Sequence, residues 1–245
     1  SVWRDPIAFE YRDYHIISMP PPSSGGIALE QLFKMIAPYD VKSLQFQSAA
    51  AVHLMTEAER RVYADRAYYL GDPDFVHIPY KSLVDSLYIE KRMADFNPRQ
   101  ASKSSNINHG IIESEETTHY CIVDQVGNAV SMTTTLNGSY GSYTVVKGAG
   151  FLLNNGMDDF SVKPGTPNLY GLVGAEANKI EPRKRMLSSM TPTIVTKNNK
   201  LAIVVGTPGG STIITSVFQT LVNVIDFEMN IDQAVQSPRF HHQWL

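Results

Sequence analysis

The stretch Glu113–Val130, ESEETTHYCIVDQVGNAV, decides how the chain is organised. Its start is polar and acidic, and two β-type runs, THYCIVD and AVSMTTT, follow it. The runs flank Gln125–Asn128, which is typical of a β-hairpin. A polar segment therefore leads directly into a strand that begins Thr117-Thr118-His119. Two interpretations are open here: a solvated loop enters a sheet, or the chain is cut so that Thr117 becomes a new N-terminus.

Composition places the chain among ordinary globular proteins. It has 245 residues, of which 43% are hydrophobic and 18% are charged. The formal net charge of −3 gives no basic surface for nucleic acid. No apolar run reaches the roughly 20 residues of a membrane span. A single cysteine, Cys121, excludes an intramolecular disulfide and a cysteine-built zinc site, and we expect it to be a small core residue in a strand.

The chain before the hairpin is predicted to be mainly helical. Ser23-Ser24-Gly25-Gly26 precedes a helical apolar pattern, with serine as N-cap. Further helices are expected over 48–70 and 80–96, the second of which Asn97-Pro98 ends. Residues 99–116 lack apolar periodicity and are predicted to form an exposed, mobile linker.

The chain after the linker is rich in strands at first. A second hairpin, TPTIVTK and LAIVVG around Asn198-Asn199, is predicted, and a long glycine- and proline-rich loop over 161–185 precedes it. GTPGGS then opens an apolar helix, and a short helix follows over 230–238. The prediction is one α+β domain of layered helices and antiparallel sheet, not a parallel βαβ sheet.

Gly206–Ser211, GTPGGS, allows three interpretations. A phosphate cradle is disfavoured because the P-loop lysine and the Gly-x-Gly-x-x-Gly spacing are absent. A structural tight turn and an oxyanion hole, in which backbone N–H groups face developing negative charge, both remain open.

Other polar pairs have structural explanations by default. His241-His242 are adjacent and lack a third ligand at metal-site spacing, so we expect structural histidines. Asp158-Asp159 suits a turn or cap, or a cation-binding carboxylate if a site is close. Ser188-Ser189 follows a basic run and suits a loop.

A threonine nucleophile has a chemical rationale. The chain has no Gly-x-Ser-x-Gly elbow, so an α/β-hydrolase serine is not indicated. An N-terminal threonine carries its own base, because the free α-amino group has a pKa near 8. This chemistry requires the Glu116-Thr117 bond to be broken.

Several motifs together resemble the γ-glutamyltransferase family, whose members are N-terminal-nucleophile hydrolases with an αββα sandwich. They are SMPPPSSGG, EAERRVYADRAYYLGDPDF, TTHYCIVDQVGNAVSMTTTLN, LLNNGMDDFSVKPGTPNLYGLVG, RMLSSMTPTIV, GTPGGS and SPRFHHQWL. They follow the family's order and spacing over nearly the whole chain. The resemblance implies self-cleavage into a large subunit, whose C-terminal part is 1–116, and a small catalytic subunit, 117–245. The sandwich is expected to be partial, truncated at both ends.

The resemblance also implies a role for individual residues. Thr117 is the nucleophile, Thr135 orients it, and the N–H groups of Gly209 and Gly210 form the oxyanion hole. Four further residues contact the substrate: Asn137, Asp159 at the α-ammonium, and Ser188 and Ser189 at the α-carboxylate. Tyr170 lies on a lid.

The implied reaction moves the γ-glutamyl group of glutathione and related compounds to water, an amino acid or a peptide, with no metal or organic cofactor. The implied location is the periplasm or the exterior. An acylase acting on a cephalosporin side chain or a γ-glutamyl polymer, and an unprocessed inactive fragment, are the alternatives. The chain departs from the family at Gly156, where Gln or Glu is usual, and it lacks the family's upstream arginine for the α-carboxylate.

Overall fold

The computed structural model describes residues 2–107, 117–164 and 175–244. A four-stranded antiparallel sheet with the order β1-β2-β5-β6 lies at its centre. The strands are β1 (Ile7–Tyr11), β2 (Tyr14–Ser18), β5 (Thr193–Lys197) and β6 (Lys200–Val205). Because β2 pairs with β5, the sheet joins chain from both sides of the predicted cleavage point.

Strands β1 and β2 correct the prediction of a helical first half. Ile7, Phe9 and Tyr11 are buried, whereas the residues between them are exposed, which is the period-two pattern of a strand with one covered face. Arg12, with a φ of 55°, makes the turn into β2. The alternation spans too few residues to stand out beside the longer helical patterns.

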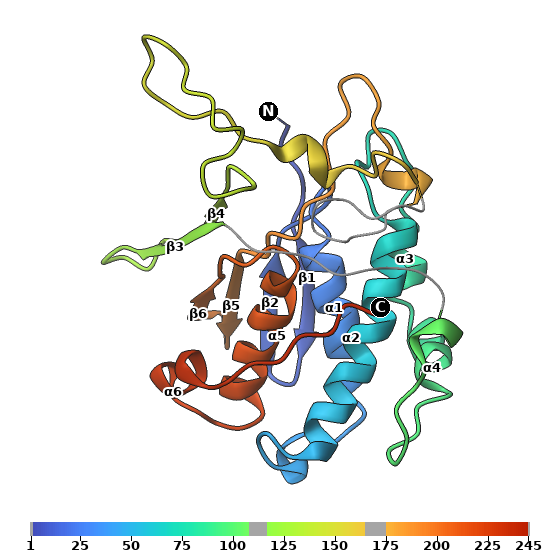
Figure 1. Cartoon of the computed structure of the whole chain (residues 1–245). Helices are drawn as coiled ribbons and strands as arrows, with labels where there is room; N and C mark the ends of the chain where they lie inside the picture. Colours follow the sequence, from blue (N-terminus) through green and yellow to red (C-terminus); the bar gives the residue numbers. More distant parts are fainter. Residues whose placement is uncertain (1, 108–116, 165–174, 245) are drawn as a thin grey trace.

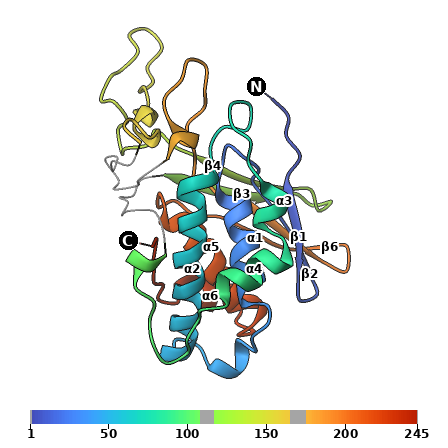
Figure 2. The same ribbon diagram turned by 90° about the vertical axis from the view of Figure 1, so that its right-hand side faces the viewer.

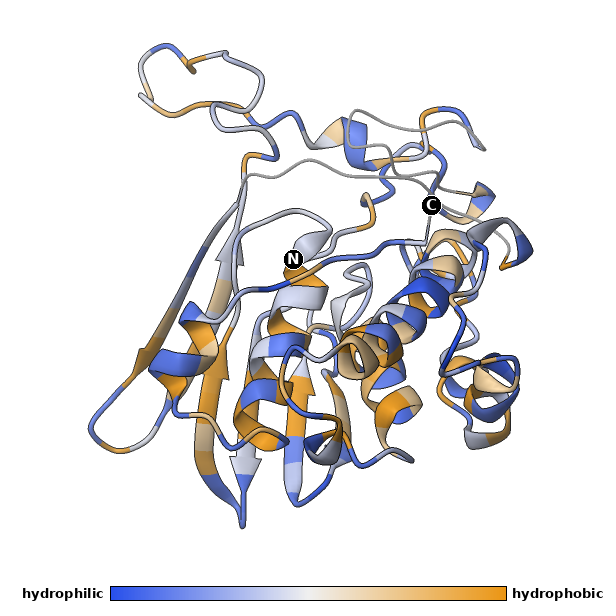
Figure 3. Ribbon diagram, turned by 60° about the horizontal axis from the view of Figure 1, so that its bottom comes forward, coloured by the Kyte–Doolittle hydropathy of each residue, from blue (hydrophilic) through white to orange (hydrophobic). Residues whose placement is uncertain are grey.

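Helices cover one face of this sheet (Figures 1 and 2). They are α1 (Gly25–Ile36), α2 (Ala49–Tyr69) and α5 (Thr212–Ile225), with α3 (Tyr80–Leu83), α4 (Ser86–Met93) and α6 (Ile231–Gln236) further out. Short 3-10 turns η1 (Lys42–Leu44), η2 (Ser104–Asn106), η3 (Gly156–Asp159) and η4 (Glu176–Asn178) complete the elements. In Figure 3 hydrophobic residues follow the strands and the helices packed on them.

Aromatic rings tie the two layers together. The ring of Phe33 on α1 lies 4.4 Å from that of Tyr11 on β1 and 5.1 Å from that of Phe218 on α5, measured between centroids. All three side chains are buried. Helix α1 is therefore held between the sheet and α5.

Two predictions about helix ends need correction. Ser24 is the residue before α1, but its side chain makes no cap hydrogen bond; its hydroxyl donates to Ser188 O instead, at 2.8 Å. The helix expected over 80–96 is broken into α3 and α4, because Asp85 caps a new helix by accepting from the N–H groups of Leu87 and Tyr88.

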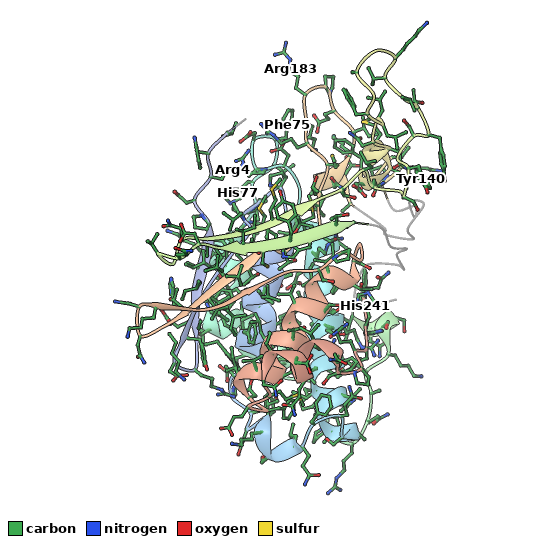
Figure 4. The ribbon with its side chains drawn as sticks, turned by 90° about the vertical axis from the view of Figure 1, so that its left-hand side faces the viewer. Arg4, Phe75, His77, Tyr140, Arg183 and His241 are labelled. Carbon is green, nitrogen blue, oxygen red and sulfur yellow. The ribbon has the colours of Figure 1, made fainter. Side chains whose placement is uncertain are left out.

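The predicted first hairpin is present as β3 (Thr118–Val123) and β4 (Ala129–Thr134). It crosses the face of the sheet that the helices leave open (Figure 4), where Ser131 Oγ donates to Val205 O at 3.0 Å. Its outward face carries the exposed apolar side chains Tyr120, Ile122, Val130 and Met132. Within the described residues no helix covers that face, so three layers of the αββα sandwich are visible.

The second hairpin, β5–β6, is also as predicted. Asn198 and Asn199 have φ values of 51° and 58°, the left-handed pair that a two-residue hairpin turn requires. None of the helices in the three described ranges combines the length and hydrophobicity needed to cross a membrane.

Candidate active site

Thr117 lies at the open end of the first hairpin, directly before β3. Because Thr118 pairs with Thr134 in an antiparallel register, Thr117 lies opposite Thr135. The hydroxyl of Thr117 donates to Thr135 Oγ at 3.5 Å, and Thr135 Oγ also accepts from the N–H of Asn137 at 2.9 Å. The hairpin register therefore fixes the position of the Thr117 hydroxyl.

A cavity of about 430 Å³ opens at this hydroxyl. Its lining joins the hairpin end to the glycine turn before α5. The lining residues are Thr117, Thr118, Thr134, Thr135, Leu136, Gly138, Ser139, Pro208 and Gly209. The cavity brings together Thr117, Thr135 and Gly209 of the sequence-predicted residues, while Gly210 lies next in the chain.

The glycine turn is rigidly attached to the helices. Gly209 and Gly210 have φ values of 129° and 53°, which favour glycine at both positions. Gly209 O accepts from the N–H of Thr212 at 3.0 Å and starts α5. The Tyr63 hydroxyl from α2 donates to Ser211 O, and Ser211 Oγ donates to Gln243 at 2.7 Å. The turn is fixed and Gly209 lines the same cavity as the Thr117 hydroxyl, so the tight-turn and oxyanion interpretations are compatible.

Asn137 connects the hairpin to η3. Its φ is 75°, and its side-chain amide donates to Asn155 O at 3.3 Å. The side chain of Asn155 returns a bond by accepting from the N–H of Gly138 at 2.8 Å. Asn155 directly precedes η3, so these bonds connect the end of the hairpin to the 3-10 turn that carries Asp159.

Asp159 is a half-buried carboxyl at the end of η3. Burial raises its pKa to about 7, while the positive charge of Arg66 opposes that rise and the negative charge of Asp158 adds to it. A carboxyl poised between two charge states is characteristic of functional sites. An incoming ammonium group would favour its ionised form.

Gly156 lies against Met186 at the start of η3. A Cβ placed on Gly156 would lie 2.9 Å from Met186 Cε, the mobile end of a flexible side chain. The residue that the family usually has at this place would need Met186 to move. The departure noted in the sequence thus has a steric counterpart.

Ser188 and Ser189 lie beside the residues that precede α1. Ser188 O accepts from both the N–H and the hydroxyl of Ser24 at 2.8 Å, and Ser188 Oγ accepts from the N–H of Met190 at 3.1 Å. Ser189 is buried and its hydroxyl accepts from Arg66 Nη2 at 2.8 Å. Arg66 was missed by the sequence analysis, because a charged residue on a helix normally faces solvent.

The histidine pair makes hydrogen bonds to neighbouring helices. His241 lies beside α5, where its Nδ1 is 2.8 Å from Thr215 Oγ1 (Figure 4). Burial lowers the pKa of His242 to about 4, and its N–H donates to Glu59 at 2.9 Å. No group of three His, Cys, Asp or Glu side chains in the described ranges could hold a metal ion.

Three sequence-based assignments have other outcomes. Cys121 is exposed on the hairpin rather than buried, so the core assignment is wrong. Tyr170 and the Glu116 side of the scissile bond lie outside the described residues. The predicted linker was expected to be mobile, but its described part is anchored to the fold. Trp244 Nε1 donates to Ser104 O and to Ile107 O. The N–H of Ser102 donates to Glu57.

The fold, together with a hairpin that starts at a threonine beside a fixed glycine turn, defines the class as an N-terminal-nucleophile hydrolase. Similarity to a cephalosporin acylase from Bacillus halodurans agrees at the level of the fold: the TM-score is 0.78 at 23% identity, over 98% of this chain and 41% of that one. A mutant of Helicobacter pylori gamma-glutamyltranspeptidase matches with a TM-score of 0.51 at 67% identity, over 52% of this chain and 68% of that one.

The family model for gamma-glutamyltranspeptidase matches residues 1–245, and the chain belongs to that family. It is 51% identical over 248 residues to a glutathione hydrolase proenzyme of Escherichia coli, covering all of this chain and 43% of that protein. It is 52% identical over 245 residues to the same-named proenzyme of Pseudomonas aeruginosa, covering 99% and 44%. An acylase ACY 1 proenzyme of a Pseudomonas species is 39% identical over 237 residues, covering 96% and 40%. The chain thus spans less than half the length of these relatives.

Proposed function

We propose that this chain carries the catalytic centre of a γ-glutamyl hydrolase and transferase that acts on glutathione and related γ-glutamyl amides. The observation that carries the proposal is the single cavity shared by Thr117, Thr135 and Gly209. Membership of the gamma-glutamyltranspeptidase family supports it, as do relatives near 50% identity that are named glutathione hydrolase proenzymes.

The reaction begins after cleavage of the Glu116-Thr117 bond has freed the Thr117 amine. That amine takes the proton of Thr117 Oγ while the oxygen attacks the γ-amide carbonyl. N–H groups of Gly209 and Gly210 stabilise the resulting oxyanion. When the intermediate collapses, the C–N bond breaks, the leaving amine takes the proton, and a γ-glutamyl ester remains on Thr117.

A second attack on that ester completes the cycle. Water gives glutamate, and the amine of an amino acid or peptide gives a new γ-glutamyl amide. In both cases the Thr117 amine accepts the attacking proton and returns it to Thr117 Oγ. Thr135 holds the Oγ in line, since it already accepts a hydrogen bond from it. The mechanism requires no metal or organic cofactor.

The remaining site residues recognise the glutamyl end of the donor. Asp159 pairs with the α-ammonium group, and the hydroxyls of Ser188 and Ser189 bind the α-carboxylate. Asn137 contacts the donor from the hairpin side, and Tyr170 belongs to a lid. We further propose that parts 1–116 and 117–245 are the two subunits of one precursor, and that the enzyme works in the periplasm or outside the cell.

Mass spectrometry and a γ-glutamyl 4-nitroanilide assay of the complete gene product test this proposal. We expect two pieces split before Thr117 and steady release of nitroaniline. Thr117→Ala should abolish both, and Thr117→Ser should retain part of both. Release of γ-linked glutamate by the Thr117→Ala variant would sink the assignment, and an uncut, inactive wild type would support the alternative of an unprocessed fragment.

A second candidate function is acylase activity on a cephalosporin side chain or a γ-glutamyl polymer. The relative named acylase ACY 1 proenzyme, 39% identical, and the missing side chain at Gly156 favour testing it. Comparison of kcat/KM for glutathione and for a glutaryl-cephalosporin in the same preparation separates the two. We expect glutathione to be preferred, because Asp159 and the serine pair suit an α-amino acid.

A further inference from the structure

Arg66 is a buried cation on α2 without an ion-pair partner in the described ranges. Arg66 is only 4% exposed. No carboxylate oxygen of the described residues lies within ion-pair distance of its guanidinium group, unlike those of Arg60 and Arg92. By contrast, Arg61 on the same helix pairs with Glu57 at 2.6 Å. Burying a charge without a counter-ion is costly, so a retained one points to a ligand or a task.

The guanidinium group of Arg66 is held by two serine hydroxyls. Its Nε donates to Ser24 Oγ at 2.9 Å, and its Nη2 donates to Ser189 Oγ at 2.8 Å. Ser24 precedes α1 and Ser189 precedes β5, so one side chain joins three segments. Figure 2 shows the end of α2 reaching the loops that carry η3 and η4, and the N–H of Ala175 donates to Ala67 O there.

The two hydroxyls differ in what they do with their own protons. Ser24 Oγ accepts from Arg66 and donates to Ser188 O at 2.8 Å, so both of its functions are used. Ser189 Oγ accepts from Arg66, but in the described ranges its O–H has no acceptor. Because a hydroxyl has one proton to donate, the bond from Arg66 leaves Ser189 as an oriented and polarised donor.

We infer that Arg66 is a positioning residue: it orients the Ser189 hydroxyl directly and holds the Ser188 segment in place through Ser24, so that the two serine hydroxyls form a preset receptor for the α-carboxylate of the donor. The inference rests on the proposed function. The positive charge of the Arg66 guanidinium group also suits a pocket that must accept a carboxylate. An arginine does this better than a lysine, because the planar guanidinium serves both hydroxyls at once.

Arg66 also acts on the other charged end of the glutamyl group. Its positive charge lowers the pKa of Asp159 against the effect of burial, while Asp158 raises it. The ionised form of Asp159 is the one that binds an ammonium group. One buried cation therefore biases both ends of the recognition site toward an amino acid.

The test is Arg66→Met in the complete gene product, with γ-glutamyl 4-nitroanilide and its carboxylate-free analogue, 4-aminobutyryl 4-nitroanilide. We expect the KM for the γ-glutamyl donor to rise by about 10- to 100-fold, the effect of losing a charge-assisted hydrogen bond, with little change in kcat. At a pH well above the acid limb, where Asp159 is ionised in both proteins, the kcat/KM for the analogue should stay nearly unchanged. Adding Ser189→Ala to Arg66→Met should change KM little further, because the two act as a unit.

The pH profile gives a readout that a structural role would not move. Loss of the Arg66 charge should raise the pKa of Asp159, so the acid limb of kcat/KM should shift to higher pH. Arg60→Met is the matched control, since Arg60 is a buried α2 arginine that contacts Glu57 and Ser104 instead. It should lower the melting temperature without moving KM or the acid limb.

The outcomes separate the two proposals. A wild-type protein that releases no nitroaniline from the γ-glutamyl donor overturns the proposed function. An active wild type whose Arg66→Met variant loses both donors equally, with the acid limb unmoved, overturns the role of Arg66. If Arg66→Met fails to fold, Arg66→Lys is the second variant, because it keeps the positive charge but loses the planar guanidinium group that reaches both serine hydroxyls. We expect Arg66→Lys to raise the KM for the γ-glutamyl donor and to leave the acid limb of kcat/KM near its wild-type position. An unchanged KM in Arg66→Lys would also overturn the role of Arg66.

Discussion

The imidazole ring of His119 occupies the space that a side chain at Gly206 would need. A Cβ on Gly206 would overlap the ring atoms of His119. His119 lies on β3, two residues after Thr117, and Gly206 begins the turn that contains Gly209. The same His119 ring is 2.9 Å from Thr133 Oγ1 on β4 through Nδ1. The strand that follows Thr117 is thus packed directly on the start of the glycine turn.

Gly206→Ala tests this contact. Forcing a methyl group against the ring should cost about 1–3 kcal/mol of unfolding free energy, as overpacking does. It should also displace the glycine turn from Thr117 and slow both self-cleavage and turnover. Chemical denaturation and the rate of subunit formation measure the two effects. The rescue control is Gly206→Ala with His119→Ala, which should regain stability; a double variant as damaged as the single one would contradict the packing argument.

Thr135→Val removes the acceptor of the Thr117 hydroxyl while keeping the shape. The 3.5 Å bond to Thr117 Oγ and the bond from the N–H of Asn137 are both lost. A net hydrogen bond contributes about 0.5–1.5 kcal/mol, so we expect kcat to fall by up to about tenfold with KM for the donor little changed. Thr196→Val on β5, away from the cavity, is the control. Equal rates for Thr135→Val and wild type would remove Thr135 from the site.

The raised pKa of Asp159 predicts a pH-dependent affinity for the donor. Burial places this pKa at about 7 in the free protein. Above that pH the carboxylate binds the donor ammonium, and below it the neutral acid does not, so kcat/KM should fall as pH drops through about 7. Asp159→Asn should remove this limb and weaken donor binding by about 2–5 kcal/mol, while self-cleavage continues. An unchanged acid limb in Asp159→Asn would assign the titration to another group.

Gly156→Gln should strengthen donor binding. The added Cβ would lie 2.9 Å from Met186 Cε, which can swing away, and 3.3 Å from Asn154 Oδ1. We expect the amide to extend toward Asp159, which lies in the same 3-10 turn. We expect KM for the γ-glutamyl donor to fall several-fold. Gly156→Ala is the control, because it displaces Met186 without adding a polar group. A lower KM for both variants would mean that displacing Met186, rather than the amide, causes the change.

The sequence predicts the hairpins and most helices because their signals are local. Asn198-Asn199 fits one turn type, and Ser48 and Asn230 cap the helices that follow them by accepting from Ala51 N and Gln233 N. Strands β1 and β2 escape prediction because each has only five residues, and β2 gains its second partner, β5, from beyond residue 190. The resemblance to a known family identifies Thr117 as a candidate from the sequence. Arg66 can be identified only from the folded structure, because a charged residue on a helix normally faces solvent.

The exposure of Cys121 has a related cause. Its strand alternates correctly, but the sequence does not reveal which layers surround the hairpin. Ile122 and Val130 face outward and are exposed, whereas Cys121 lies on the inward face with His119 and Ser131. Cys121 is exposed even so, which shows that the inward face is incompletely covered there. A β-type pattern predicts a strand, and burial depends on what covers it.

Glu59 predicts a pH dependence of stability that is independent of catalysis. The carboxyl is completely buried on α2, and it accepts hydrogen bonds from Gln219 Nε2 at 3.3 Å and from the N–H of His242 at 2.9 Å. In the described ranges no cation pairs with it, and burial raises its pKa well above the ordinary value. The native state therefore keeps a proton that the unfolded state releases above a pH of about 4.5. The unfolding free energy should fall as pH rises from that value toward the native pKa, and this contribution is fully present only at lower pH.

Glu59→Gln cannot ionise, so its stability relative to wild type should improve between pH 5 and pH 8, even if the amide loses one of the two hydrogen bonds. Urea denaturation of both proteins at the two pH values measures the difference. A stability difference that stays constant with pH would show that Glu59 titrates alike in the folded and unfolded chain.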